Sequence, residues 1–235
     1  MDGIVKEQLI DMFRLQDDLN KKININWRDI RKKEDFVRAT WIECAELVDS
    51  LPWKWWKKQE PNIDNVKVEI VDIWHFIMSY LLMEFQKYED IVNSEYIEYM
   101  FKGINKDFKH IEDVNSAYIH HYLGESDKIQ RIIYSAERVA EGFLKENIKE
   151  GIFFFGLLVN EVLKFNELYL LYIGKNILNH IRQEFGYKDG KYKKHIEGFE
   201  DNKYMFEIVQ TVKCKEELEQ KLREKFTEIF SKIDN

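Results

Sequence analysis

Apolar residues recur at helical spacing over most of the chain. Near the N-terminus, Val5, Leu9 and Met12 stand four and three residues apart, which is the spacing of one buried helix face. The same pattern predicts long helices at residues 4–23, 34–50, 64–88, 126–147, 152–185 and 215–233. Because no strand-like alternation and no internal repeat stands out, we expect an all-α helical bundle.

Glycine and proline mark the expected breaks between these helices. Pro52 follows the second helix and ends it, since proline cannot continue the hydrogen-bond ladder. Gly151 is expected to separate two helices and Gly174 to soften the later one. Gly186 is a natural helix end. Residues 21–33 are expected to form a loop because charged residues and asparagines cluster there.

The middle of the chain has the weakest pattern. Residues 94–108 are expected to be helical, with breaks at Gly103 and Gly124. Residues 89–150 as a whole are the part that the pattern constrains least. With 235 residues, the chain has the length of one substantial core, so we expect a single domain over residues 1–235.

The helix at 64–88 is apolar nearly all the way round and still carries Glu69 and Asp72. Residues three apart share a helix face, and buried carboxylates are normally paired or bound to metal. Glu43 and Glu46 repeat this spacing on the preceding helix. If the two helices face each other, the four carboxylates form an acidic cup, whose oxygen ligands suit Mg²⁺ or Mn²⁺ better than zinc.

A basic group lies near the C-terminal end of the chain. Lys175, Asn179 and Arg182 share one helix face, and the turn at 186–194 adds further lysines. A polyphosphate requires both kinds of group, because metal ions bridge its oxygens and cations neutralise the remaining charge. We therefore interpret the acidic cup and the basic group as two parts of one site.

Other polar or aromatic residues stand where the helical pattern calls for apolar ones. Gln16 and Asn20 lie on the core-facing side of the first helix and require partners there. His75 extends the row formed by Glu69 and Asp72. The tryptophans of the 51–58 loop either cover the core or offer a stacking surface for a base.

Charge and cysteine content narrow the class of protein. A formal net charge of -7 argues against a general nucleic-acid binder. Cys44 and Cys214 are far apart and form no metal-binding spacing, so a cytoplasmic location is expected. The first residues lack the pattern of a secretory leader. The longest apolar runs, 73–83 and 152–160, are too short to span a membrane.

With these residues identified, the chain resembles the dimeric dUTPases. These belong to the all-α nucleoside triphosphate pyrophosphatase superfamily, together with MazG-like enzymes and dCTPases. The resemblance extends over residues 10–205 and is loosest at 89–150. The motifs that carry it are Glu43-x-x-Glu46, Glu69-x-x-Asp72, Gln16-Asp-Asp-Leu-Asn20, Lys175-Asn-x-Leu-Asn179-x-x-Arg182 and Gly186-Tyr-Lys-Asp-Gly190.

The resemblance implies an α-helical homodimer that converts dUTP, and also dUDP, to dUMP with Mg²⁺. It implies that more than one ion is held by Glu43, Glu46, Glu69 and Asp72, and that Glu43 or Glu46 also activates the attacking water. The residues that it implies for the nucleoside pocket are Gln16, Asn20, Trp56 and His75. Those that it implies for the phosphates and sugar are Lys175, Asn179, Arg182, Tyr187, Lys188, Lys194 and Asn202.

Three other functions remain open from the sequence. The first is a pyrophosphatase for another nucleotide such as dCTP. The second is a helical binding protein without activity, in which the acidic pairs would be ordinary solvated helix faces. The third is a di-iron protein, because Asp72-x-x-His75 is similar to the Glu-x-x-His of di-iron bundles. That class requires two such motifs and the chain shows one.

Overall fold

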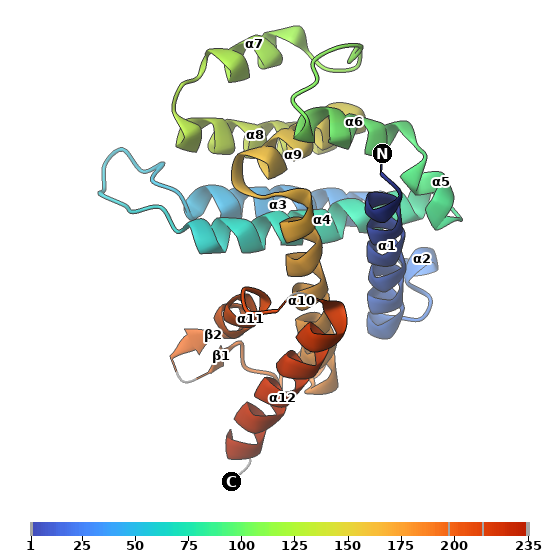
Figure 1. The fold of residues 1–235 in the computed structure, drawn as a ribbon, viewed down its shortest axis with the longest axis vertical. Coiled ribbons are helices and arrows are strands. Elements are labelled where there is room, and N and C mark those ends of the chain that lie inside the picture. The colour runs from blue at the N-terminus through green and yellow to red at the C-terminus, as the bar shows by residue number, and fades with distance from the viewer. Residues whose placement is uncertain (1, 197, 213, 234–235) are drawn as a thin grey trace.

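The computed structural model describes residues 2–196, 198–212 and 214–233 (Figure 1). These residues form twelve α-helices, one 3₁₀ helix and a two-stranded hairpin, so the predicted all-α class is confirmed. The α-helices are α1 (Gly3–Ile23), α2 (Trp27–Ile30), α3 (Lys33–Asp49), α4 (Ile63–Glu84), α5 (Tyr88–Val92), α6 (Glu95–Ile104), α7 (Ser116–Gly124), α8 (Lys128–Leu144), α9 (Ile148–Val162), α10 (Phe165–Glu184), α11 (Asp201–Val209) and α12 (Lys215–Ile233). The other elements are η1 (Tyr187–Asp189), β1 (His195–Ile196) and β2 (Phe199–Glu200).

Helix α4 lies at the centre of the core. It packs against α3 along its length and also contacts α1, α9 and α10. Trp74 of α4 stacks on Phe155 of α9 and meets Phe13 of α1 edge to face, so one side chain joins three helices. In Figure 1, α3 and α4 form one layer, α6, α8 and α9 form a second, and α1 and α10 run across the first. This crossing brings α1 to α4 at Gln16 and α10 to α4 at Lys175.

Two pairs of glycines allow close crossings within the second layer. A Cβ added at Gly156 of α9 would lie 2.1 Å from the carbonyl oxygen of Met100 on α6. Gly142 of α8 is in a similar position against Gly151 of α9. Glycine therefore lets these backbones approach to a separation that no side chain would permit.

Two of the expected helix breaks were wrong. Gly151 lies inside α9, and Gly174 lies inside α10 against Met205 and Val209. Each is a site of close packing, which tolerates glycine within a helix. The actual break falls at Leu163 and Lys164, which have extended backbones and separate α9 from α10.

Several other boundaries differ from those predicted. The expected loop at 21–33 contains the end of α1 and the short helix α2, whose Trp27 is buried and donates its Nε1–H to Asp17. The helix predicted at 64–88 ends at Glu84, and α5 follows it. Both cysteines are free, Cys44 buried and Cys214 exposed. No helix among the described residues has the length and apolarity needed to cross a membrane.

Candidate active site

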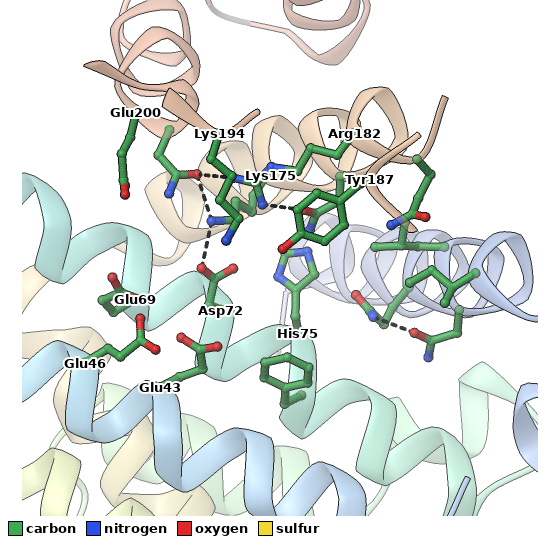
Figure 2. Close-up of a pocket in the computed structure, with 18 residues that line it drawn as sticks. Glu43, Glu46, Glu69, Asp72, His75, Lys175, Arg182, Tyr187, Lys194 and Glu200 are labelled. Atoms are coloured by element: carbon green, nitrogen blue, oxygen red, sulfur yellow. Dashed lines mark hydrogen bonds and ion pairs between the residues drawn. The ribbon is translucent and has the colours of Figure 1, made fainter. Parts of the chain in front are cut away.

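The two acidic pairs face each other across the α3–α4 contact. Glu43 and Glu46 project from α3 and Glu69 and Asp72 from α4 toward one point (Figure 2). One carboxylate oxygen each from Glu43, Glu69 and Asp72 lie within 4.8 Å of one another. Glu46 lines the same cavity, nearer to solvent. These four residues form the acidic cup, in the arrangement that the sequence predicted.

The acidic cup has fewer positive charges than carboxylates. Burial, together with repulsion from Asp72 and the other carboxylates, raises the pKa of both Glu43 and Glu69. Lys175 Nζ lies 2.7 Å from Asp72 Oδ2 and forms an ion pair with it. Asn65 donates a hydrogen bond to Glu69 Oε1 at 2.9 Å. One lysine against four carboxylates leaves a negative site that would favour added cations.

The opposite wall of the cavity is basic and comes from α10. Lys175 is 3% exposed, and its Nζ also donates to Asn202 Oδ1 at 2.9 Å. Arg182 donates to both carboxylate oxygens of Asp201, at 2.8 Å from Nε and 2.7 Å from Nη2. Burial alone would raise the pKa of Asp201, but the hydrogen bonds from Arg182 hold it below its usual value. The guanidinium is therefore fixed beside the cavity.

The residues after α10 close this end of the site. The 3₁₀ helix η1 begins after Gly186, which has φ of +80° and turns the chain back. Tyr187 and Lys194 then reach the cavity, and the hairpin places Glu200 there. Tyr192 donates its hydroxyl hydrogen to Asp201 at 2.9 Å and so ties this segment to the Arg182 pair.

Side-chain amides and a histidine line the other end of the cavity. Gln16 and Asn20 come from α1, and His75 comes from α4. His75 Nδ1 donates to the carbonyl of Val71 at 2.8 Å. Burial lowers the pKa of the ring to about 4, so the imidazole is neutral near pH 7. Its Nε2 is buried and has no hydrogen-bond partner within the described residues, and it offers a lone pair.

The cavity has a volume of about 360 Å³, which is in the range of small-molecule sites. It brings together thirteen of the fifteen residues that the sequence marked for the site, from α1, α3, α4, α10 and the segment after α10. These residues are Gln16, Asn20, Glu43, Glu46, Glu69, Asp72, His75, Lys175, Asn179, Arg182, Tyr187, Lys194 and Asn202.

Two predicted residues lie outside the cavity wall. Trp56 is 58% exposed in the loop between α3 and α4, where it contacts Trp53 and Trp55. Lys188 donates instead to the carbonyl of Ile23 at the end of α1. Their roles toward a ligand stay predictions.

The cavity also includes residues that the sequence did not mark. Leu19 and Ile23 stand three residues after Gln16 and Asn20, Gln183 stands four residues after Asn179, and Phe76 follows His75. Helical spacing from the marked residues could have found them. Glu200 had no such signal, since the hairpin that carries it determines its position.

Comparison with known families agrees with this geometry. A family model described as dUTPase matches residues 8–187. The matched region contains the acidic cup, the amides of α1 and the whole of α10, and it ends before the hairpin and α11. A search of curated proteins found no match.

Proposed function

The chain belongs to the all-α dimeric dUTPase family of nucleotide pyrophosphatases, and on this basis we propose that it hydrolyses dUTP to dUMP and pyrophosphate. The observation that supports the proposal most strongly is one cavity with an acidic cup, a basic wall and buried amides. A nucleoside triphosphate has parts that match these features of the cavity. Its phosphate chain requires cations, and its neutral base requires hydrogen-bonding partners.

The donor set of the acidic cup fits Mg²⁺, with Mn²⁺ as a substitute. Glu43, Glu69 and Asp72 supply only oxygen atoms, and His75 is held by Val71 at the other end of the cavity. Hard divalent cations prefer such ligands. We propose that the four carboxylates hold more than one ion. When bound, the ions would neutralise phosphate oxygens and lower the pKa of a water molecule.

Glu43 and Glu46 are placed to handle the proton of the attacking water. Both project from α3 into the cup, and Glu46 is the more accessible to solvent. A general base must lie within hydrogen-bond reach of the proton that it removes. We assign to one of these two glutamates the acceptance of that proton while pyrophosphate leaves.

The basic wall would bind the phosphate chain. Lys175 and Arg182 are held in place by Asn202 and Asp201, so they require little reorganisation when an anion arrives. Lys194 and Tyr187 come from the segment after α10 and face the same space. Metals and cations that grip the inner phosphates would also accept dUDP, and we include dUDP as a substrate.

The remaining end of the cavity suits an uncharged deoxynucleoside. The bare Nε2 of His75 can accept a hydrogen bond from a sugar hydroxyl. Leu19, Ile23 and Phe76 form apolar parts of the wall, where an additional 2′-hydroxyl would lose water without gaining a partner. This wall favours deoxyribose over ribose.

We further propose that the enzyme acts in the cytoplasm as a homodimer. The free cysteines fit a reducing compartment. Dimerisation rests on the family and on exposed tryptophans such as Trp55, which is 90% exposed.

A substrate screen tests the proposed function. Purified protein is incubated with Mg²⁺ and dUTP, dCTP, dTTP or UTP, and pyrophosphate is followed. We expect dUTP to be the fastest of the four. Equal or faster release from dCTP would assign the enzyme to the neighbouring substrate class of the same superfamily.

A further inference from the structure

Ser79 of α4 lies at the centre of a buried hydrogen-bond network. It is 1% exposed and contacts Gln16 and Asn20, which line the cavity, although it is not itself part of the cavity wall. Its Oγ is 2.9 Å from the carbonyl oxygen of His75, 3.1 Å from Gln16 Nε2 and 3.0 Å from Asn20 Nδ2. One hydroxyl therefore contacts both amides that were predicted for the nucleoside pocket.

The number of available hydrogens determines how these groups are oriented. A hydroxyl has one hydrogen to donate, and a backbone carbonyl can only accept. Ser79 therefore donates to His75 and presents only lone pairs to the two amides. Both amides must turn their NH₂ groups toward Ser79, because an amide oxygen there would face another acceptor. The hydrogen-bonding capacity of the partners therefore fixes the orientations of both amides.

The two amides differ in how many of their hydrogen-bonding groups are already used within the protein. Gln16 Nε2 uses its second hydrogen on Asn20 Oδ1 at 3.1 Å. Its Oε1 lies 3.3 Å from the hydroxyl of Tyr172, which shares its single hydrogen with the carbonyl of Met12 at 3.0 Å. Both N–H groups of Gln16 are thus used within the protein, and its side chain is buried. Asn20 is only half-buried and retains one N–H and one Oδ1 lone pair beside the cavity. Of the two amides, Asn20 is therefore the one that can offer a base both a donor and an acceptor.

We propose that Ser79 is the positioning residue for base choice: through Gln16 and Asn20 it fixes one amide orientation that accepts uracil and rejects cytosine. This inference rests on the proposed function. Uracil offers an N3–H donor next to a carbonyl acceptor, and cytosine offers an N3 acceptor next to an amino donor. An Asn20 amide free to turn by 180° could pair with either base.

The network opposes that rotation. A turned Asn20 would bring Oδ1 against Ser79 Oγ, whose hydrogen is already donated to His75. It would also bring Nδ2 against Nε2 of Gln16. The first contact would bring two acceptors together and the second two donors. Cytosine could therefore pair with Asn20 only if these buried groups were left unpaired, and such a loss discriminates strongly between substrates.

The test measures binding of the nucleoside monophosphates dUMP and dCMP, which reports base choice apart from hydrolysis. Calorimetry gives the ratio of the two dissociation constants for wild-type protein, for Ser79→Ala and for Ser135→Ala. Ser135 is a matched control, since it is also a fully buried serine in a helix and its Oγ has no partner within the described residues. Alanine is the best helix former, so both variants are expected to fold.

We expect Ser79→Ala to reduce the preference for dUMP by roughly tenfold or more and Ser135→Ala to leave it unchanged. If Ser79→Ala fails to fold, Ser79→Cys, with its weaker acceptor, is expected to give an intermediate ratio. A wild-type ratio in the Ser79 variant would overturn the role of Ser79 alone. Equal affinity of wild-type protein for dUMP and dCMP would overturn the proposed uracil substrate, and the role of Ser79 with it.

Discussion

The carboxylates of the acidic cup lower the stability of the metal-free fold, although they are the residues that would hold a metal ion. Glu43 lies among three other carboxylates that α3 and α4 hold in place. Its pKa is raised from 4.5 to about 8 by burial and by the charge of Asp72. A carboxyl group whose pKa is higher in the folded than in the unfolded chain opposes folding once the unfolded group ionises. The cup is thus a site that the fold supports at a cost in stability.

Replacing this carboxylate should stabilise the metal-free protein. Between pH 4.5 and about 8, Glu43 keeps its proton in the folded chain but loses it in the unfolded chain. The free energy of unfolding therefore falls as the pH rises through this range. We therefore expect Glu43→Gln to melt at a higher temperature than wild type in a chelating buffer at pH 8, with a smaller difference at pH 5. Thermal unfolding at both pH values checks this. The control is Glu112→Gln at an exposed position, and a lower melting temperature for Glu43→Gln at pH 8 would contradict the account.

At the scale of elements, the fold depends on helices that cross closely, and the cavity depends on the segment after α10. Gly103 and Gly156 let α6 and α9 meet backbone to backbone. The segment after α10 is held by the pair of Arg182 and Asp201. The crossing supports the second layer of the fold, away from the cavity, and the Arg182–Asp201 pair fixes the basic wall of the cavity.

The glycine crossing should not tolerate a methyl group. A Cβ at position 156 would lie 2.1 Å from a backbone oxygen, so the helices must separate. We expect Gly156→Ala to lower the free energy of unfolding by about 3 kcal/mol or more. Gly124→Ala is the control, since nothing lies within 4 Å of its added Cβ in α7. Chemical denaturation of both variants compares them, and equal stabilities would show that the crossing is looser than described.

The Asp201 pair should matter for phosphate binding as well as for stability. Asp201→Asn leaves the buried charge of Arg182 without its counter-ion, at a cost of about 3 kcal/mol. We also expect weaker binding of dUTP, with little change for deoxyuridine, because Arg182 belongs to the basic wall that we propose for the phosphates. Asp189→Asn, an exposed position in η1, is the control. An equal loss of affinity for both ligands would indicate a general structural defect.

The sequence predicted the long helices and the acidic cup because both depend on local spacing. Glu69 and Asp72 share a helix face whatever surrounds them, and an apolar helix restricts where that face can point. The break at Leu163 was not predictable from local signals, because neither glycine nor proline marks it. The contacts of Ser79 with Gln16 and Asn20 had no local signal in the sequence, since they depend on how α1 packs against α4. Glu200 depends on the path of the chain after α10.

At the scale of the whole molecule, the outer surface carries large aromatic residues. Trp53 and Trp55 are 41% and 90% exposed in the loop that projects between α3 and α4 (Figure 1). Trp41, 39% exposed, lies with Trp53 on the edge of a second, apolar groove. Exposed apolar patches are uncommon on monomeric proteins and usually mark a site of interaction with another molecule.

We expect a stable dimer. Light scattering on the full chain at micromolar concentration should give twice the mass of 28.6 kDa. A stable dimer would bury part of this aromatic surface. A monomeric mass under the same conditions would remove the homodimer from the account.

The most direct test of the central claim is pyrophosphate release from dUTP as a function of Mg²⁺ by wild-type protein, Glu46→Gln and Asp72→Asn. The account predicts release by wild type that requires Mg²⁺ and a loss on the order of 10³-fold in both variants, which remain folded. Removing a carboxylate from a crowded acidic cup does not weaken the metal-free fold. Turnover near the wild-type rate in both variants, or release that does not depend on a divalent cation, would contradict the claim that the acidic cup is the metal site of a dUTP pyrophosphatase.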